Sequence, residues 1–342
     1  MKICIFVPFM TGYGGTETVI HNLLNENNNL KLICVGGCND PEWLENIENK
    51  RIISLCYPKK MRDLISIIML PLLILQENPD IVISTNPVMW FVAYYFRKLF
   101  RKKYKVVSWY HYSFAGKSVS NIFLHSADIY LAISSGIVSE LEKRGVSKNK
   151  IKLIFNPISR NTISIPRTKD GSTCNFIYVG RVMLDGQKNL RSLINILSHV
   201  EGDWKLTIFG KGEIKEVEQY VNEKKLQDRI EFKGFVTHFW ECCDNVDALL
   251  LSSKYEGFGM VLAEAISVGV PVISYNCPSG PSDIVNKKNG FLIDLDDEYS
   301  FEKVITKFVN RKVDFSNISE IKGSISKLYS KNFLNIFLKS IM

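Results

Sequence analysis

Residues 248–276 read ALLLSSKYEGFGMVLAEAISVGVPVISYN, a succession of strand, turn, helix and strand patterns. The runs ALLLSS and PVISYN are short and apolar, whereas the residues from Met260 to Val268 favour a helix. Gly257 and Gly259 allow a sharp bend between the first strand and this helix. Strands that alternate with helices in this way are typical of a parallel sheet.

The same alternation continues through both halves of the chain. The first half contains the strand candidates KICIFVPF, KLICVGG, RIISLCY, DIVIST, KVVSWYH, IYLAIS and IKLIFN. The second contains CNFIYVGR, WKLTIFG, IEFKGF, ALLLSS, PVISYN and GFLID. The 342 residues are also about the right number for two ordinary domains. We therefore predict an α/β protein with two Rossmann-like, doubly wound parallel-sheet domains that face each other across a ligand-binding cleft.

A polar stretch separates the two halves. The sequence SRNTISIPRTKDGST at 159–173 has neither strand nor helix periodicity and is typical of a linker. We predict a first domain over 1–160, the linker over 161–172, a second domain over 173–325, and a C-terminal helix over 326–342. This last helix is expected to pack back towards the first domain.

The composition indicates a cytoplasmic globular protein. No apolar stretch reaches the roughly 18 to 20 residues that a membrane-spanning helix needs. The longest, Leu64 to Leu75, contains Pro71, and we interpret it as a buried or interfacial helix. The opening MKICIFVPF lacks a cleavage site and is better explained as a first strand than as a signal peptide. The eight cysteines are scattered and are expected to be reduced thiols.

The net charge of +8 comes entirely from the first half of the chain. Residues 1–165 hold 20 Lys and Arg against 12 Asp and Glu, whereas 166–342 hold 23 of each. Such a bias attracts anionic surfaces such as phosphorylated glycolipid, membrane lipid or nucleic acid. A solvated helix end would explain the densest run equally well. The run, a candidate acceptor or membrane surface, contains Arg97, Lys98, Arg101, Lys102, Lys103 and Lys105.

Two glycine-containing loops are candidate phosphate sites. The loop TGYGGTE places Gly14 and Gly15 at the start of a helix, where backbone amides can bind an anion. NAD binding is not favoured, because the second strand ends in Val35-Gly36-Gly37 rather than in a ribose-binding acid. In the second half, YVGRVMLDGQKNL places Arg181 and Lys188 around a loop that follows a strand, a setting that suits a diphosphate.

Two glutamates flank the glycine turn of the opening stretch. Glu256 precedes the turn, and Glu264 lies inside a helix that is otherwise apolar, so its carboxylate needs a partner. No His and Cys cluster indicates zinc. Asp294 and Asp296 spell the D-x-D of a metal-dependent sugar-transferase fold, but their place before a helix favours capping or solvated acids. We therefore expect no metal site.

These motifs resemble glycosyltransferase family four, whose members have the GT-B fold. GGTE, SWYHYS, LAISSGI, FNPIS, YVGR with GQKN, YEGFGMVLAEA and CPSGPSDIV occur in the family's order over nearly the full length. The resemblance implies that Arg181 and Lys188 bind the donor diphosphate, that Glu264 binds the ribose hydroxyls, and that His111 lies near the reacting carbon. Arg181, Lys188, Glu256 and His111 would be the catalytic residues. The remaining donor contacts implied by the resemblance are Gly14, Gly15, Phe258, Gly259, Met260 and Val261.

Within the family, the chain most resembles the galactosyltransferases that build lipopolysaccharide. The resemblance implies a retaining transferase that needs no metal or other cofactor and moves a hexose, galactose from UDP-galactose, to a cell-envelope glycan such as lipopolysaccharide core. The acceptor would bind the first domain, the UDP-sugar the second, and the protein would attach peripherally to the inner face of the cytoplasmic membrane.

Several alternatives remain open at this point. The donor could be UDP-glucose or a UDP-N-acetylhexosamine, with capsule, exopolysaccharide or teichoic acid as product. A nucleotide-sugar 2-epimerase shares the architecture, and a non-catalytic nucleotide-sugar-binding subunit is a more distant possibility. Nucleic-acid binding is not expected, because no recognition motif accompanies the positive charge.

Overall fold

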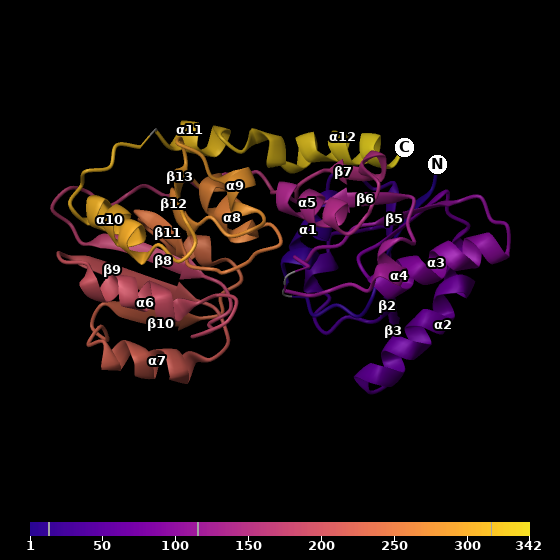
Figure 1. Ribbon diagram of the computed structural model, residues 1–342, viewed down its shortest axis with the longest axis horizontal. Helices are drawn as coiled ribbons and strands as arrows, with labels where there is room; N and C mark the ends of the chain where they lie inside the picture. The colour runs from indigo at the N-terminus through magenta and orange to yellow at the C-terminus, as the bar shows by residue number, and fades with distance from the viewer. Residues whose placement is uncertain (13, 115, 316) are drawn as a thin grey trace. The chain divides into compact units, whose positions relative to one another are not determined.

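The chain folds into two α/β units (Figure 1). Met1–Ile158 and Leu328–Met342 form the first unit, and Ser159–Lys327 form the second. The predicted linker therefore belongs to the second unit, where Ile165 is buried and its amide donates to the Val268 carbonyl at 2.9 Å. The computed structural model describes residues 1–12, 14–114, 116–315 and 317–342.

A seven-stranded parallel sheet in the order β3-β2-β1-β4-β5-β6-β7 forms the centre of the first unit. Its strands are rich in Ile, Val and Leu because helices cover both faces of a parallel sheet. The strands are β1 (Ile3–Val7), β2 (Leu30–Gly36), β3 (Lys50–Ser54), β4 (Ile81–Ser84), β5 (Lys105–Ser108), β6 (Ile129–Ala132) and β7 (Ile151–Leu153). The helices are α1 (Gly15–Leu24), α2 (Lys59–Glu77), α3 (Pro87–Leu99), α4 (Asn121–Leu124), α5 (Ser135–Lys143) and α12 (Ser330–Ile341).

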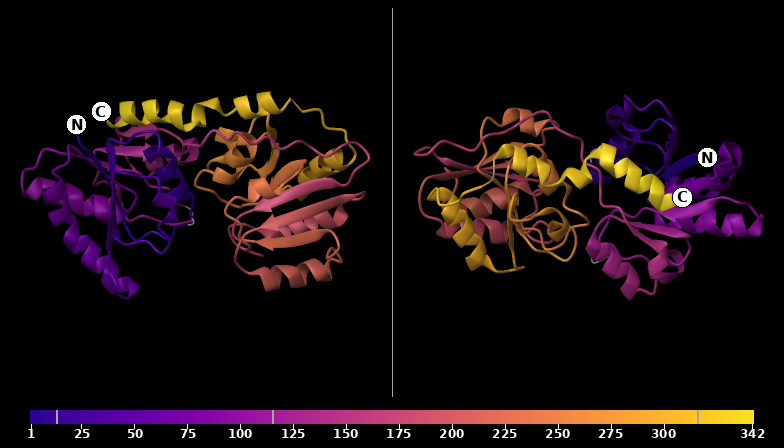
Figure 2. Two further views of the ribbon diagram at one scale, coloured as in Figure 1. Left: turned by 180° about the vertical axis from the view of Figure 1, so that it is seen from behind. Right: turned by 90° about the horizontal axis from the view of Figure 1, so that it is seen from above.

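The C-terminal helix α12 completes the core of the first unit. Its inward side chains Phe333, Phe337 and Ile341 are fully buried, and the Phe337 ring lies 5.4 Å from that of Trp109. The backbone anchors it as well, because the Ser330 amide donates to the Ile158 carbonyl at 3.0 Å. Segments from the two ends of the chain are thus part of one core, as Figure 2 also shows.

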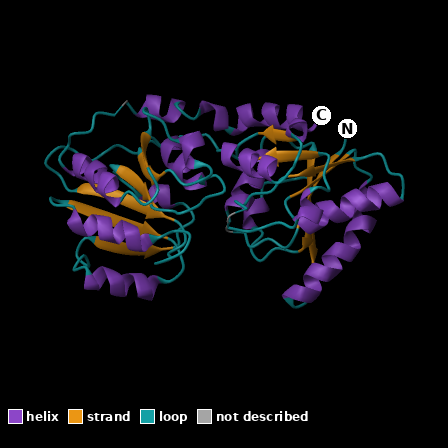
Figure 3. Ribbon diagram, viewed as in Figure 1, coloured by secondary structure: helices purple, strands orange, loops and turns teal. Residues whose placement is uncertain are grey.

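A six-stranded parallel sheet in the order β10-β9-β8-β11-β12-β13 forms the centre of the second unit (Figure 3). The strands are β8 (Cys174–Val179), β9 (Trp204–Phe209), β10 (Ile230–Gly234), β11 (Ala248–Leu251), β12 (Val272–Tyr275) and β13 (Gly290–Ile293). The helices are α6 (Leu190–His199), α7 (Ile214–Glu223), α8 (Met260–Ser267), α9 (Pro281–Ile284), α10 (Glu298–Val309) and α11 (Ile318–Gly323). Short 3₁₀ turns span Glu42–Leu44, Lys148–Lys150, Phe239–Cys242 and Ser326–Leu328.

All thirteen predicted strands are present, and every strand pairing is parallel. The prediction of two doubly wound α/β domains is therefore confirmed. In each sheet the strand order reverses once, between β1 and β4 and between β8 and β11. Ligands of such sheets bind at the carboxyl ends of the strands beside this reversal. The loops after β8 and β11 are therefore where a ligand of the second unit is expected.

Helix α2 is not buried as a whole. Its inward residues, including Leu70, Leu73 and Ile74, pack into the first unit, but Leu64, Ile68 and other apolar residues are solvent-exposed. The run Leu64 to Leu75 was predicted to be a buried or interfacial helix, and a buried helix is wrong for its outer side. No helix in the described ranges has both the length and the apolar character required to cross a membrane.

Candidate active site

Arg181 and Lys188 lie in the loop between β8 and α6, on the carboxyl side of the sheet. The Arg181 guanidinium is exposed and donates to the Gln187 side-chain oxygen at 2.6 Å. The Lys188 side chain is 12% exposed, and its amino group lies 2.7 Å from a Glu256 carboxylate oxygen. The two cations therefore lie at the strand reversal, as the sequence predicts for a diphosphate site.

Lys188 and Glu256 form a largely buried ion pair that links the loops after β8 and β11. Only 10% of the Glu256 side chain is exposed. Two such charges are expensive to remove from water, and their mutual attraction offsets this cost only while both are present. The pair therefore holds a cation and a carboxylate side by side at the edge of the sheet.

Gln187 joins the same two loops with both ends of its amide. Its oxygen accepts from Arg181, and its nitrogen donates to the Tyr255 carbonyl at 3.1 Å. The backbone strengthens the connection, because the Lys254 amide donates to the Gln187 carbonyl at 2.9 Å. Ser252 adds a hydrogen bond from its hydroxyl to the Lys188 carbonyl at 3.0 Å. These bonds fix Arg181 and Lys188 relative to the glutamate loop.

A third segment supports the turn that carries Glu256. The Ser279 hydroxyl donates to the Glu256 carbonyl, and Gly280 packs directly against the backbone of Phe258. At the end of the turn, Gly259 adopts φ +87° and precedes the first residue of α8. The first amides of a helix have no intrahelical acceptor and suit an anionic ligand. The amides predicted to contact the donor, from Phe258 to Val261, lie in this turn and the first turn of α8.

Glu264 lies one helical turn further along α8 and has no side-chain hydrogen bond within the described residues. The side chain is only partly exposed, and desolvation raises the pKa of its carboxyl to about 7. Burial of an unpaired carboxylate is unfavourable, so the group is poised to accept hydrogen bonds from a ligand. This fits the predicted contact with ribose hydroxyls.

We expect the binding of UDP, the ligand that the family resemblance implies, to strengthen as the pH rises through about 7. Hydroxyl donors favour the ionised Glu264, so UDP binding should release a proton from this group wherever the free protein still carries it. The raised pKa of Glu264 also affects folding. Between about pH 4.5 and 7 the folded state holds a proton on Glu264 that the unfolded state has lost, so the free energy of unfolding falls as the pH rises through this range. Calorimetric titration with UDP in buffers of different ionisation enthalpy measures the proton release.

Glu264→Gln is the control for this experiment, because UDP phosphate itself titrates near pH 6. The variant should keep the proton change that belongs to the phosphate and lose the part that belongs to the carboxyl. Equal proton release by both proteins would show that Glu264 does not contact the nucleotide.

His111 follows β5 in the first unit, and both of its ring nitrogens are buried without a hydrogen-bond partner among the described residues. Burial lowers the pKa of the imidazole to about 3, so the ring is neutral at physiological pH. The Trp109 ring lies 4.7 Å away, and its indole nitrogen is also unpartnered in the described structure. His111 can therefore donate or accept a hydrogen bond but does not act as a cation.

The loop after β1 is held by Glu17, the acid of the GGTE motif. Its carboxylate accepts from the Thr11 amide at 3.1 Å, the Thr11 hydroxyl at 2.9 Å and the Gly12 amide at 3.3 Å. The carboxylate lies against Gly14, where an added Cβ would come within 2.4 Å of it. Gly14 and Gly15 thus begin α1 as predicted, with Glu17 beneath the loop.

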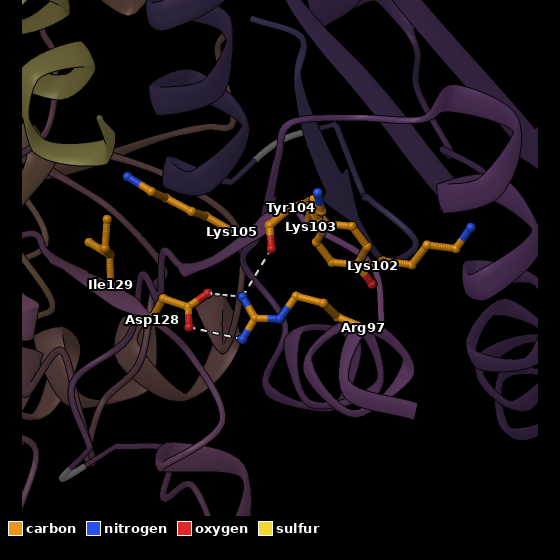
Figure 4. Close-up of a pocket in the computed structure, with 7 residues that line it drawn as sticks. All are labelled: Arg97, Lys102, Lys103, Tyr104, Lys105, Asp128 and Ile129. Carbon is orange, nitrogen blue, oxygen red and sulfur yellow. Dashed lines mark hydrogen bonds and ion pairs between the residues drawn. The ribbon is translucent and has the colours of Figure 1, made fainter. Parts of the chain in front are cut away.

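Some cations of the basic run at 97–105 already have partners within the first unit. Arg97 forms a bidentate ion pair with Asp128 and also donates to the Tyr104 carbonyl at 2.9 Å. Figure 4 shows this pair, with the amino groups of Lys102 and Lys105 directed away from it. Lys105 donates to the Met342 carbonyl. The exposed cations that remain, Lys98, Arg101, Lys102 and Lys103, follow one another closely at the end of α3.

In the described ranges, no three His, Cys, Asp or Glu residues gather closely enough to hold a metal ion. Of the acids after β13, Asp297 caps α10 by accepting from the Ser300 amide at 2.9 Å. Asp294 and Asp296, which spell D-x-D, are not the capping residue.

Comparison with known proteins decides the family. The model described as glycosyltransferase family 4 matches residues 13–161, and the model described as glycosyl transferases group 1 matches residues 160–321. Along 354 aligned residues, the chain is 33% identical to lipopolysaccharide 1,6-galactosyltransferase of Escherichia coli K12, covering 100% of this chain and 98% of that protein. The chain belongs to glycosyltransferase family four. The Salmonella typhimurium galactosyltransferase of the same name is 32% identical over 99% of both chains.

Solved structures place the transferase in the GT-B fold. The apo form of the lipopolysaccharide outer core galactosyltransferase WaaB superposes with a TM-score of 0.85 and 29% identity over 99% of each chain. An Anabaena protein solved in complex with UDP superposes with a TM-score of 0.81 over 98% of this chain and 99% of that one. At 16% identity, this second likeness supports the fold alone.

Three residues of this candidate site were not assigned a role from the sequence. Gln187 lies in the motif GQKN, of which only Lys188 was given a role, and Ser279 and Gly280 lie in CPSGPSDIV, which supported the family resemblance alone. Their contacts join loops that are 68 and 23 residues apart in the chain. The sequence could have indicated a role for these residues, because both motifs lie in loops that follow strands, and such loops meet at one edge of a parallel sheet.

Proposed function

We propose that this transferase moves galactose from UDP-galactose to a lipopolysaccharide core glycan and retains the anomeric configuration. The observation that carries the proposal is the 33% identity to the Escherichia coli lipopolysaccharide 1,6-galactosyltransferase over the whole of this chain. Such a full-length match includes both the unit that carries His111 and the unit that carries the Lys188–Glu256 pair.

The residues of the second unit suit the chemistry of a sugar diphosphate. Cleavage of the bond between the sugar and the diphosphate leaves negative charge on the phosphate oxygens, which Arg181 and Lys188 stabilise. The amides at the start of α8 supply further hydrogen bonds to these oxygens. Glu264 binds the ribose, and Glu256 balances the positive charge that develops on the sugar.

The first unit contributes His111 near the reacting carbon in this proposal. With a pKa near 3, the imidazole stays neutral and offers a hydrogen bond to a sugar hydroxyl. In a same-face reaction, the departing phosphate oxygen accepts the proton of the attacking hydroxyl. No side chain is then required as a general base.

We also propose that the reaction needs no metal ion, because two fixed cations face the diphosphate. Transfer is expected to proceed at an unchanged rate after dialysis against EDTA, and added Mg²⁺ or Mn²⁺ should not raise it. A rate that falls more than about tenfold in EDTA and returns with a divalent ion would contradict this, since it would mean that a metal carries the charge stabilisation.

The proposed acceptor is a phosphorylated glycolipid, and we place the transferase at the inner face of the cytoplasmic membrane. The exposed cations Lys98, Arg101, Lys102 and Lys103 support this placement, because clustered cations attract anionic lipid and phosphate groups.

The experiment that tests the function offers the purified protein a panel of UDP-sugars together with lipopolysaccharide cores truncated before each hexose. Release of UDP and the product mass identify donor and acceptor together, and NMR of the new linkage gives its configuration. We expect UDP-galactose to be used at least about 100-fold more efficiently than UDP-glucose, because a site that hydrogen-bonds a hydroxyl strongly rejects the wrong epimer. Equal use of UDP-N-acetylhexosamines, or UDP release without an acceptor product, would refute the proposal.

A further inference from the structure

Helix α2 of the first unit exposes an apolar stripe to solvent. The stripe runs along one side of the helix, because its residues are three or four positions apart. Exposed fractions are 51% for Met61, 58% for Leu64, 63% for Ile68, 60% for Leu72 and 45% for Leu75. We call these five residues the α2 stripe.

The α2 stripe is unusual for a helix on the surface of a protein in water. The outer face of such a helix is normally charged or polar. Between Leu64 and Leu75, however, every exposed residue is apolar, while the inner face already packs against the sheet through Leu70, Leu73 and Ile74. The stripe is therefore surplus to the core, and a contiguous exposed apolar patch indicates contact with a partner.

Cations lie at both ends of the α2 stripe. Lys59 and Lys60 are exposed at its amino-terminal end. At the other end, a single pocket is lined by Leu75 of the stripe together with Lys102 and Lys103. The neighbouring pocket, drawn in Figure 4, includes the same two lysines. The apolar and basic features are thus parts of one surface.

The end of α3 repeats this combination on a smaller scale. The segment KLFRKK, residues 98–103, is exposed throughout, with Leu99 77% and Phe100 57% accessible. Helices α2 and α3 pack side by side, as Figures 1 and 2 show. The exposed cations of this surface outnumber its exposed acids. Glu77 is buried against Lys2, Lys31 and Arg51. The exposed acids are Asp63 on α2 and Asp80, whose carboxylate lies 3.8 Å from the amino group of Met1.

We propose that the α2 stripe inserts flat into the interface of a bilayer rich in anionic lipid, with the flanking cations against the phosphates. An anionic bilayer fits this surface better than a protein partner does, because its apolar acyl chains match the stripe and its charged headgroups match the lysine and arginine side chains at both ends. The proposal deepens the membrane association proposed above and rests on it. It adds that the apolar helix, and not charge alone, anchors the protein.

The test measures how the full chain partitions onto sedimented vesicles made of phosphatidylcholine alone or with phosphatidylglycerol. The wild type should bind the anionic vesicles and not the neutral ones. A triple variant, Leu64→Gln with Ile68→Gln and Leu72→Gln, should lower the partition coefficient by at least about 100-fold, because each leucine or isoleucine loses its burial in lipid. Undiminished binding of this variant would overturn the proposal.

A second variant separates charge from insertion. Lys102→Gln with Lys103→Gln should lower binding at low salt by about 30-fold, the equivalent of about 1 kcal/mol for each cation near the surface. Salt should weaken the binding of the wild type and have less effect on this variant. Tyr299→Gln is the matched control, because Tyr299 is 73% exposed on α10 of the second unit and should bind like the wild type.

Two further measurements keep the outcome interpretable. If sedimentation velocity shows a dimer that the triple variant abolishes, and the wild type ignores anionic vesicles, the stripe is a protein interface and the proposal fails. UDP binding and galactosyl transfer to a deacylated, water-soluble core should be the same in the wild type and the triple variant. If neither the wild type nor the triple variant transfers galactose, while the wild type still binds anionic vesicles, the proposed function is refuted and the proposed membrane contact is not.

Discussion

Lys188→Ala is expected to lower kcat/KM for galactosyl transfer by about 100- to 1,000-fold. In the proposed reaction the amino group faces charge that grows on the departing diphosphate, and loss of one such preorganised group typically costs this much. Glu256, the ion-pair partner of Lys188, has a side chain that is only 10% exposed and would be left without its cation. The variant should therefore also unfold at a lower temperature.

A double variant separates the two effects of Lys188→Ala. Combining it with Glu256→Gln removes the unpaired charge, so the melting temperature should return towards that of the wild type. Transfer should remain at least as low as in the single variant. If stability and transfer recover together, the lysine acts only by holding the fold, and its assignment to the diphosphate is mistaken.

Gly280→Ala is expected to lower galactosyl transfer by about 100-fold or more by displacing the turn that carries Glu256. An added Cβ would lie 2.0 Å from the Phe258 carbonyl oxygen and 2.4 Å from its carbon, and Gly280 has φ +97°. The backbone from Glu256 to the start of α8 must then move, and a displacement of about 1 Å can cost that much in rate. Steady-state kinetics and the dissociation constant for UDP measure the loss.

Gly171→Ala provides the matched control for Gly280→Ala. Gly171 also has a left-handed backbone, with φ +80°, but no atom lies within 4 Å of the position that its Cβ would occupy. The Gly171→Ala variant should lose a little stability through backbone strain, and its rate of galactosyl transfer should be unchanged. Equal losses in the two variants would show that strain alone, and not displacement of the glutamate turn, explains the effect.

Parallel sheets make much of this fold predictable from sequence. Each buried strand is a short apolar run followed by a loop, so runs such as ALLLSS and CNFIYV identify their strands directly. Because these loops meet at one edge of the sheet, the sequence also predicts that Arg181, Lys188, Glu256 and Glu264 belong to one neighbourhood. Residue type then indicates the ligand, since two cations beside helix amides suit phosphate.

Contacts between distant segments were not predictable in the same way. Nothing in the spacing shows that Lys188 pairs with Glu256, 68 residues away, or that Arg97 is neutralised by Asp128. Similarly, the run from Leu64 to Leu75 is apolar on both sides of its helix, so composition alone does not tell which side faces water. Only the packing of α2 on the sheet shows that the outer side is left uncovered.

The most direct test of the central claim is a crystal structure of the full chain with UDP. We expect the diphosphate to lie at the carboxyl ends of β8 and β11, with the Arg181 and Lys188 side chains within about 3 Å of its oxygens. The Glu264 carboxylate should accept hydrogen bonds from the ribose hydroxyls. A nucleotide bound elsewhere, or one that leaves Lys188 paired with Glu256 and Glu264 without a ligand contact, would contradict the assignment of this site.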